Sequence, residues 1–278
     1  MAVNHAIRKY DRTPHLKGSR LQPGDTTDGQ IGIEEILRRY PDAAWIQEEK
    51  LDGANSGFSF SDDLELVLQC RGHALTGGAR EAQFGPFKEW ASMHEAEFME
   101  RLENRYIVYG EWTFAKHTSF YDRLPHLFHE FDVWDRECGA YLSTPARTRL
   151  LEGLPVVQVP VLSTAWPRSG REIRDSLTRS IYTSPDWRDA LGEAAEAAGC
   201  DPARAIADSV SNDLAEGFYI KIEMEEHTVA RFKWVNPEFH QTIIDSGSHW
   251  SKRPLIRNRL MDDADLNRRP SVAEPSPE

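Results

Sequence analysis

The spacing of hydrophobic positions changes along the chain between helical and strand-like periods, which predicts a mixed α and β fold. Apolar residues from Ile33 to Tyr40 recur at helical spacing and stop before Pro41. Further helices are predicted at residues 86–104 and 145–151, and across an Ala-rich stretch, 171–212, that Gly199 interrupts.

Strands are predicted where short apolar runs are bounded by turn residues. These runs lie at residues 44–49, 56–60, 64–70, 106–111, 127–134, 156–161, 217–223 and 228–235. Turns at 61–63 and 225–226 join successive strands, so antiparallel hairpins are expected there. The chain then divides into an N-terminal arm (1–25), one large domain (26–245), and a basic C-terminal segment with a disordered tail (246–278).

Composition narrows the class of protein. The chain has 278 residues, 40% of them hydrophobic, which is enough for a sizeable core. No run approaches the roughly 18 apolar residues of a membrane helix, and the first residues lack the pattern of a secretory signal. Cys70, Cys138 and Cys200 are far apart and lack metal-ligand spacing, which indicates reduced thiols. We therefore expect a cytoplasmic protein without membrane contact.

The formal net charge of −12 argues against a simple electrostatic nucleic-acid binder, which would normally be basic. The charge is uneven, however, because the segment after residue 230 is locally basic. Its cations are Arg231, Lys233, Lys252, Arg253, Arg257 and Arg259. Such a local surface can still bind phosphates, since potential is set within a Debye length of about 8–10 Å.

Lys50-Leu51-Asp52-Gly53 has the form K-x-D-G and follows the predicted strand 44–49. A lysine placed there could attack the α-phosphate of a nucleotide and hold the nucleotide covalently. The alternative is an ordinary turn, because Asp-Gly is a common turn dipeptide and lysine is usually solvated. The interpretation of this motif therefore depends on whether other residues of a nucleotide site are found elsewhere in the chain.

Two polar groups stand at the ends of predicted strands. Arg71 follows the strand 64–70 and could bind a phosphate through its planar guanidinium; the alternative is a surface arginine before a loop. Glu111 ends the strand 106–111 and could accept hydrogen bonds from ribose hydroxyls. The alternative there is a surface glutamate.

Two further groups lie on strands. In the strand 127–134 alternation places Glu130 and Asp132 on one face and Phe131 on the other, where the ring could stack on a base or simply fill the core. A metal cluster of His126, His129 and Asp132 fits no zinc spacing.

In the strand 228–235 alternation places Arg231 and Lys233 on one face. Two neighbouring cations repel unless an anion such as a triphosphate lies between them. The strand before it begins with Glu216-Gly217. The alternative is an amphipathic strand with a solvated face.

Taken in order, these segments resemble the motifs of the covalent nucleotidyltransferases, the polynucleotide ligases and capping enzymes. The resemblance is greatest to ATP-dependent RNA ligases of the RNA ligase 2-like family and covers about residues 45–260. It implies an α+β fold: a nucleotidyltransferase domain, ATP-grasp-like, with antiparallel sheets flanked by helices. We expect no added OB-fold domain, because the sequence ends about 45 residues after Lys233.

The resemblance also implies a role for each residue. Lys50 would form lysyl-AMP with ATP and release pyrophosphate. Arg71 would contact the nucleotide or the 5′-phosphate end, Glu111 the ribose, and Phe131 the adenine. Glu216 would help place Mg²⁺ or Mn²⁺.

Four further residues complete the implied site. Arg231 and Lys233 would orient the phosphates, Asn55 would place the 5′-phosphate of the substrate, and Glu49 would assist adenine recognition. We also expect Arg231, Lys233 and a bound metal to lower the pKa of Lys50, so that the amine can react.

The implied reaction joins 5′-phosphate and 3′-hydroxyl ends of nicked or broken RNA, with an end-healing kinase or phosphatase as a candidate partner. One departure concerns Arg231, which stands where many relatives have lysine; arginine cannot release a proton, so only a phosphate-binding role fits it. Two alternatives remain open from the sequence. One is a DNA ligase or a GTP-dependent capping-type transferase, and the other is an inactive nucleotide- or RNA-binding module on the same fold.

Overall fold

The computed structural model describes residues 7–21, 27–239 and 254–267. Within them, eleven strands form one sheet in the order β4-β3-β2-β5-β6-β7-β11-β10-β1-β9, and β8 pairs with β6. Their bounds are β1 Ala44–Glu49, β2 Ala54–Phe60, β3 Leu66–Cys70, β4 His73–Ala74, β5 Tyr106–Trp112, β6 Phe128–Asp135, β7 Ala140–Leu142, β8 Val157–Gln158, β9 Val161–Ser163, β10 Gly217–Met224 and β11 His227–Val235. All pairs are antiparallel except β6 with β8.

Helices cover both halves of the sheet. They are α1 Ile33–Arg39, the 3₁₀ helix η1 Ala79–Phe84, α2 Gly85–Met93, α3 Glu95–Leu102, α4 Thr144–Leu151, α5 Gly170–Asp175, α6 Trp187–Ala197 and α7 Pro202–Ala207. The expected α+β fold, antiparallel strands with flanking helices, is confirmed. The described strands all belong to this sheet, so that part of the chain contains no separate OB-fold barrel.

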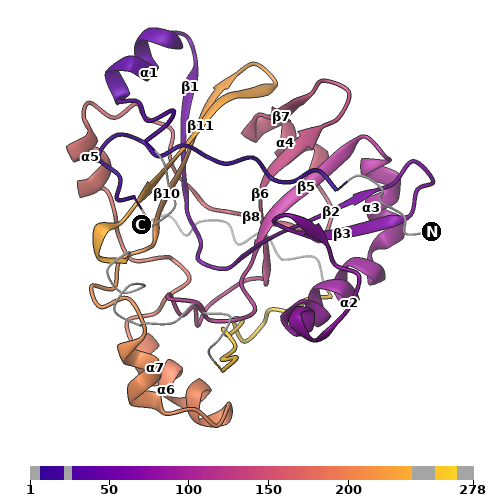
Figure 1. Ribbon diagram of the computed structural model, residues 1–278, viewed down its shortest axis with the longest axis vertical. Helices are drawn as coiled ribbons and strands as arrows, with labels where there is room; N and C mark the ends of the chain where they lie inside the picture. The colour runs from indigo at the N-terminus through magenta and orange to yellow at the C-terminus, as the bar shows by residue number, and fades with distance from the viewer. Residues whose placement is uncertain (1–6, 22–26, 240–253, 268–278) are drawn as a thin grey trace.

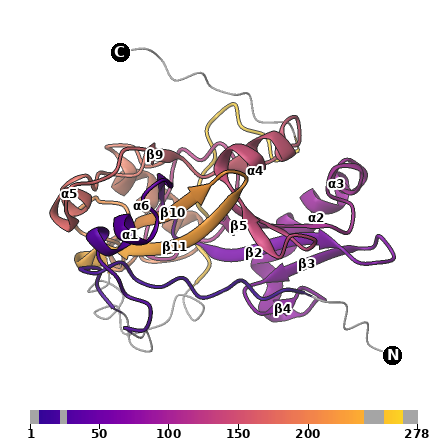
Figure 2. The ribbon, with the colours of Figure 1, turned by 90° about the horizontal axis from the view of Figure 1, so that it is seen from above.

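The sheet has two halves with separate cores (Figures 1 and 2). One core lies between β2, β5 and β6 and the helices α2 and α3, around Phe58, Trp90 and Phe128. The other lies between β1, β10 and β11 and the helices α1 and α5, around Trp45 and Ile220. The site described below lies where these halves meet.

Three predicted elements differ from the structure. The single helix at 86–104 is two helices, because His94 leaves helical geometry between α2 and α3. The strand at 156–161 is β8 and β9, separated by a segment whose Pro160 carbonyl accepts a hydrogen bond from the Glu49 amide at 3.0 Å. The stretch 171–212 holds only three short helices, since Ser, Thr and Pro between 176 and 186 favour turns.

The two ends of the described chain pack on this framework. Residues 7–21 cross the sheet (Figure 1), with the Arg8 carbonyl bound to Tyr109 at 2.7 Å and the Leu16 amide bound to the Lys233 carbonyl at 2.8 Å. Residues 254–267 pack against the loop between β5 and β6. The predicted disordered tail from 268 onward lies outside the described residues.

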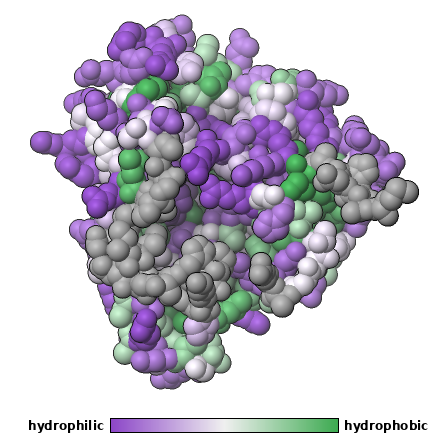
Figure 3. Space-filling model, viewed as in Figure 1, coloured by the Kyte–Doolittle hydropathy of each residue, from purple (hydrophilic) through white to green (hydrophobic). Residues whose placement is uncertain are grey.

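On the face in Figure 3, the visible apolar side chains form small separate patches among polar ones. The described residues contain no helix long and apolar enough to cross a membrane.

Candidate active site

Lys50 stands directly after β1, beside the start of β10. Antiparallel pairing sets Glu49 opposite Phe218, so the last residue of one strand meets the first residues of the other. The Lys50 amide donates to the Gly217 carbonyl at 3.0 Å, and its Nζ lies 2.5 Å from Oε2 of Glu216. Two motifs that are 166 residues apart in sequence are thereby joined.

A cavity of about 610 Å³ opens at this point. Eight of the nine residues singled out from the sequence line it: Glu49, Lys50, Asn55, Arg71, Glu111, Phe131, Glu216 and Lys233. Residues from the N-terminal arm, from Tyr10 to Thr13, add to the wall. A volume of this size accommodates a nucleotide.

Asp52 and Gly53 fix the loop that follows Lys50. Oδ2 of Asp52 accepts from the amides of Thr118 and Ser119, both at 2.7 Å. A Cβ at Gly53 would lie 2.6 Å from the Trp112 carbonyl oxygen, so any other residue would displace the loop from β5. Asp52-Gly53, which could be an ordinary turn by sequence, is therefore held in place by hydrogen bonds and close packing and fixes the loop that carries Lys50.

Glu111 and Asn55 reach the cavity from neighbouring strands. They are directly opposite each other in the β2–β5 pairing. Oε1 of Glu111 accepts from the Gly53 amide at 3.1 Å, which ties the carboxylate to the lysine loop. Burial raises the pKa of Glu111 to about 8, although the nearby Lys50 ammonium opposes that rise.

In the protein without a metal ion, Lys50 does not have the lowered pKa that is expected with Arg231, Lys233 and a bound metal around it. Burial by itself lowers the pKa of Lys50, but Glu216, Glu111 and Asp52 outweigh burial, and the net direction is upward. Burial also raises the pKa of Glu216 to about 7, against the attraction of Lys50. Without metal or nucleotide, the ammonium is thus held by carboxylates.

Phe131 reaches the cavity because β6 carries a bulge. In the β5–β6 register Tyr109 pairs with Asp132 but Gly110 pairs with Glu130, so Phe131 has no partner on β5. A bulge of this kind redirects a side chain. The ring packs against Tyr219, with centroids 5.9 Å apart and planes at 24°, and against the edge of Tyr10.

Glu49 is almost fully buried, with 3% of its surface exposed, yet it lines the cavity. Its Oε1 has no hydrogen-bond partner among the described residues. Burial raises the pKa of Glu49 to about 7, while hydrogen bonds with Ser180 and the Ile181 backbone act the other way.

Arg71 and Lys233 both line the cavity, whereas Arg231 lies outside its wall. Arg71 is exposed in the turn after β3, and Lys233 is half-buried on β11. The guanidinium of Arg231 pairs with Asp132 at 2.9 Å and lies 3.7 Å above the Tyr141 ring centroid. The structure therefore does not bring Arg231 together with Lys233 at the cavity.

Sequence reasoning missed a buried chain of charges beneath the site. Arg147 bonds Glu48 and Glu130, and Lys221 pairs with Glu48 at 3.0 Å and with Asp132 at 3.1 Å. Lys221 also donates to the Phe131 carbonyl, which secures the bulge. Charged residues inside otherwise apolar strands could have revealed its members on β1, β6 and β10, but Arg147 lies on helix α4 and gives no such signal.

The candidate metal cluster at His126, His129 and Asp132 has other partners. The His129 ring packs against Tyr182 at 5.1 Å, and His126 bonds backbone groups of Phe128. The described residues contain no group of three His, Cys, Asp or Glu side chains arranged to hold a metal ion.

Residues 43–235, more than half of the chain, match the model of the RNA ligase family. The chain belongs to the RNA ligase family. The resemblance carried by the ordered motifs is thereby confirmed at the level of the family. A comparison with curated protein sequences found no significant match.

The RNA ligase fold also appears in solved structures of an RNA ligase from Naegleria gruberi. A variant with ATP and manganese has a TM-score of 0.55 and 17% identity, over 86% of this chain and 59% of that chain. The structure with pyrophosphate has a TM-score of 0.54 and 17% identity, over 88% and 63%. A variant with AMP and manganese has a TM-score of 0.52 and 16% identity, over 86% and 59%. This chain spans less than two thirds of the length of these relatives, and likeness at such identity shows the fold.

Proposed function

We propose that this protein is an ATP-dependent RNA ligase that joins 5′-phosphate and 3′-hydroxyl ends through lysyl-AMP on Lys50. The observation that carries the proposal is the position of Lys50: its amine enters a nucleotide-sized cavity beside Glu216, within the RNA ligase fold. An inactive binding module would not require this lysine to face the cavity.

The choice of ATP over GTP rests on Glu49 and Phe131. Glu49 lines the cavity, and its buried Oε1 makes no hydrogen bond among the described residues, so the carboxyl would offer an acceptor to a bound base. Adenine presents an exocyclic amine that donates to such an oxygen, whereas guanine presents a carbonyl at the same ring position. Phe131 supplies a ring for stacking.

A divalent cation fits the donor set of the cavity. Lysines and arginines on its wall are Arg12, Lys50, Arg71 and Lys233, against the carboxylates Asp11, Glu49, Asp52, Glu111 and Glu216. A bound triphosphate brings several negative charges of its own, which a divalent cation would partly neutralise. Mg²⁺ and Mn²⁺ bind through one or two carboxylates together with phosphates and water, so Glu216 suffices as the protein ligand. The relatives solved with ATP or AMP and manganese agree with this chemistry.

The reaction requires Lys50 to lose its proton. Glu216 stabilises the ammonium less once its charge is shared with a divalent cation. The Lys50 amine then forms a bond to the α-phosphorus, and the bond to pyrophosphate breaks. Lys233 orients the phosphates, Glu111 holds the ribose, and Arg231 acts indirectly by fixing Asp132 below the Phe131 bulge.

Later steps would use two further residues of the cavity wall. Asn55 and Arg71 would hold the 5′-phosphate of the RNA while AMP is transferred to it, and a 3′-hydroxyl would then displace AMP. Ends of that chemistry are made by end-healing kinases and phosphatases, which makes such an enzyme a natural functional partner in the cytoplasm.

Incubation with α-labelled ATP or GTP and a divalent metal tests the proposal. We expect label on the denatured protein from ATP, its loss in Lys50→Ala, and release of the label as AMP when nicked RNA is sealed. Label from GTP alone would support capping-type chemistry, and no label from either nucleotide would support a binding module. Sealing of an all-DNA nick as fast as an RNA nick would contradict the RNA assignment.

A further inference from the structure

The C-terminal segment 254–267 is tied to the loop 113–121, which connects β5 to the residues before β6. Backbone hydrogen bonds join three pairs of residues: Lys116 with Ile256 at 2.8 Å, Asn258 with Phe114 at 3.0 Å, and Arg259 with Tyr121 at 2.9 Å. These three hydrogen bonds use main-chain groups that any sequence could supply. The side chains add apolar packing of Ile256 with Phe120 and a contact of the Arg257 guanidinium with the Phe114 ring, 5.0 Å from its centroid. The hydrogen bonds from a side chain of the segment to the loop are those of Asn258.

Asn258 joins the two ends of this loop. Its Oδ1 accepts from the Tyr121 amide at 2.9 Å, and its Nδ2 donates to the Thr113 carbonyl at 2.7 Å. The residue is 7% exposed, so water does not replace these bonds readily. Only a side chain with both an acceptor and a donor can close the loop in this way.

The loop in turn holds the residue two positions after Lys50. Its tip gives the amides of Thr118 and Ser119 to the Asp52 carboxylate, both at 2.7 Å, and the Tyr121 hydroxyl accepts from the Asp52 amide at 2.8 Å. Asn258 and Asp52 are therefore both hydrogen-bonded to the same loop, 113–121.

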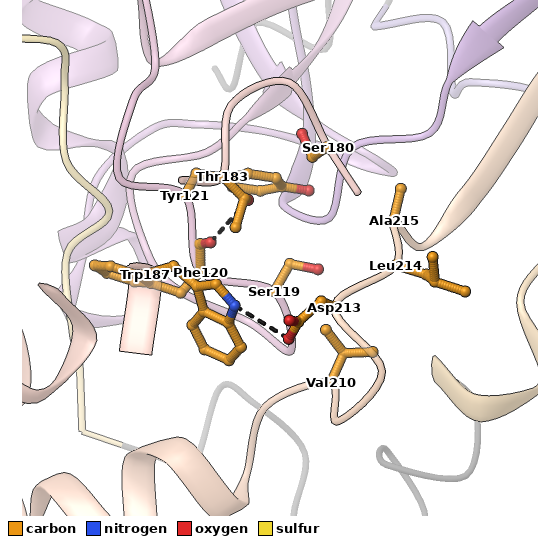
Figure 4. A pocket seen from close by; sticks show the side chains of 10 residues that line it. All are labelled: Ser119, Phe120, Tyr121, Ser180, Thr183, Trp187, Val210, Asp213, Leu214 and Ala215. Carbon is orange, nitrogen blue, oxygen red and sulfur yellow. Dashed lines mark hydrogen bonds between the residues drawn. The ribbon is translucent and has the colours of Figure 1, made fainter. Parts of the chain in front are cut away.

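Figure 4 shows Ser119 and Tyr121 on the wall of a small cavity of about 20 Å³, with Trp187 and Asp213 among the other lining residues. The loop thus packs against the helical region as well, and a cavity so small leaves it little room to adjust. A change at Asn258 is then passed on to Asp52.

We infer that Asn258 is a positioning residue for the nucleophile, although it does not line the cavity and lies 208 residues from Lys50. The inference rests on the proposed function and gives the C-terminal segment a part in the first step, the attack of Lys50 on ATP. A nucleophile displaced by about 1 Å can lose on the order of 100-fold in rate. The sealing of an end that already carries AMP requires no attack by Lys50, so that step is affected far less.

The test compares the two steps in Asn258→Ala. With α-labelled ATP, we expect the maximal rate of lysyl-AMP formation to fall about 10- to 100-fold, with half-saturating ATP changed less than about twofold. Sealing of a pre-adenylylated RNA nick should stay within about threefold of wild type. Asn267→Ala is the matched control, because Asn267 lies exposed in the same segment, and it should leave both rates unchanged.

Two outcomes overturn the inference: an unchanged rate of lysyl-AMP formation, or an equal loss in both steps, which would indicate general loss of structure. If Asn258→Ala does not fold, Tyr121→Phe breaks the same path by removing only the hydroxyl bound to Asp52, and the same split between steps is expected.

Hydrogen exchange gives a readout that does not depend on activity. In Asn258→Ala the amides of Thr118 and Ser119 should exchange about tenfold faster while those of β2 and β5 stay unchanged. Unchanged exchange at these two amides would refute the inference. A wild-type protein that takes no label would refute the proposed function instead, and the exchange result would still decide whether Asn258 holds the loop.

Discussion

Nζ of Lys50 and Oε2 of Glu216 are 2.5 Å apart, so the nucleophile of the proposed reaction begins as half of an ion pair. The same carboxylate is the proposed ligand of the metal. Glu216 therefore has opposite effects on Lys50 in the two states. In the free protein it stabilises the ammonium form of Lys50, and in the complex with ATP it would help to place the metal ion that assists the reaction.

Replacement of Glu216 by glutamine should separate these effects. In metal-free protein the pKa of Lys50 should fall, because its nearest carboxylate is gone. The pH at which an acylating reagent half-modifies Lys50 should therefore drop, measured by mass spectrometry of the Lys50 peptide. With ATP and metal, the same variant should form lysyl-AMP at least about tenfold more slowly. A half-modification pH that stays constant or rises would contradict this account.

Most elements were predictable because their signals are local. The helix before Pro41 and the two hairpins follow from periodicity and turn residues, and they appear as α1, β2–β3 and β10–β11. The prediction of one helix at 86–104 is wrong at His94, which leaves helical geometry while its ring packs against Trp90 and Phe98, contacts that periodicity does not reveal.

The residues of the candidate site were predictable from the sequence, but their ion pairs and pKa shifts were less so. Motif spacing selected eight residues that do line one cavity. Strand alternation placed Arg231 beside Lys233, but the local pattern could not show that Asp132, 99 residues away, would bind Arg231. The upward pKa of Lys50 was missed for the same reason, since Glu216 and Glu111 approach it only in the folded chain.

The buried carboxyl of Glu49 should make stability depend on pH. Burial raises its pKa from 4.5 to about 7, so the folded protein binds a proton there more tightly than the unfolded chain does. The resulting stabilisation is present in full below pH 4.5 and is lost as pH rises through about 7. A shift of this size corresponds to on the order of 3 kcal/mol.

Glu49→Gln should therefore reduce the loss of unfolding free energy between pH 5 and 8. Urea titrations of metal-free wild type and variant at both pH values measure this difference. Glu35→Gln is a suitable control, because Glu35 is on the surface helix α1 and pairs with Arg39. An equal pH dependence in wild type and Glu49→Gln would contradict the assignment.

Among the buried charges beneath the site, removing both partners of an ion pair should lower the unfolding free energy less than removing one partner alone. Arg147→Met leaves Glu48 and Glu130 buried without their shared guanidinium and should cost about 3–5 kcal/mol of unfolding free energy. Adding Glu130→Gln to Arg147→Met removes one of the unpaired charges and should recover part of that loss. Denaturant unfolding of the two single variants and the double variant gives the coupling, and strictly additive losses would argue against a shared network.

Phe131 should contribute to nucleotide binding through its ring. Phe131→Leu keeps an apolar side chain on the bulge but removes the stacking surface, so ATP should bind about 1–3 kcal/mol more weakly. The measurement is half-saturating ATP for lysyl-AMP formation, with sealing of a pre-adenylylated nick as the reference. Phe98→Leu is the matched control, because Phe98 is buried in the same core but does not line the cavity. Weakened ATP binding in the control alone would place the stacking surface elsewhere. Weakened binding in Phe131→Leu alone would support stacking by Phe131, because only this variant removes a ring that lines the cavity.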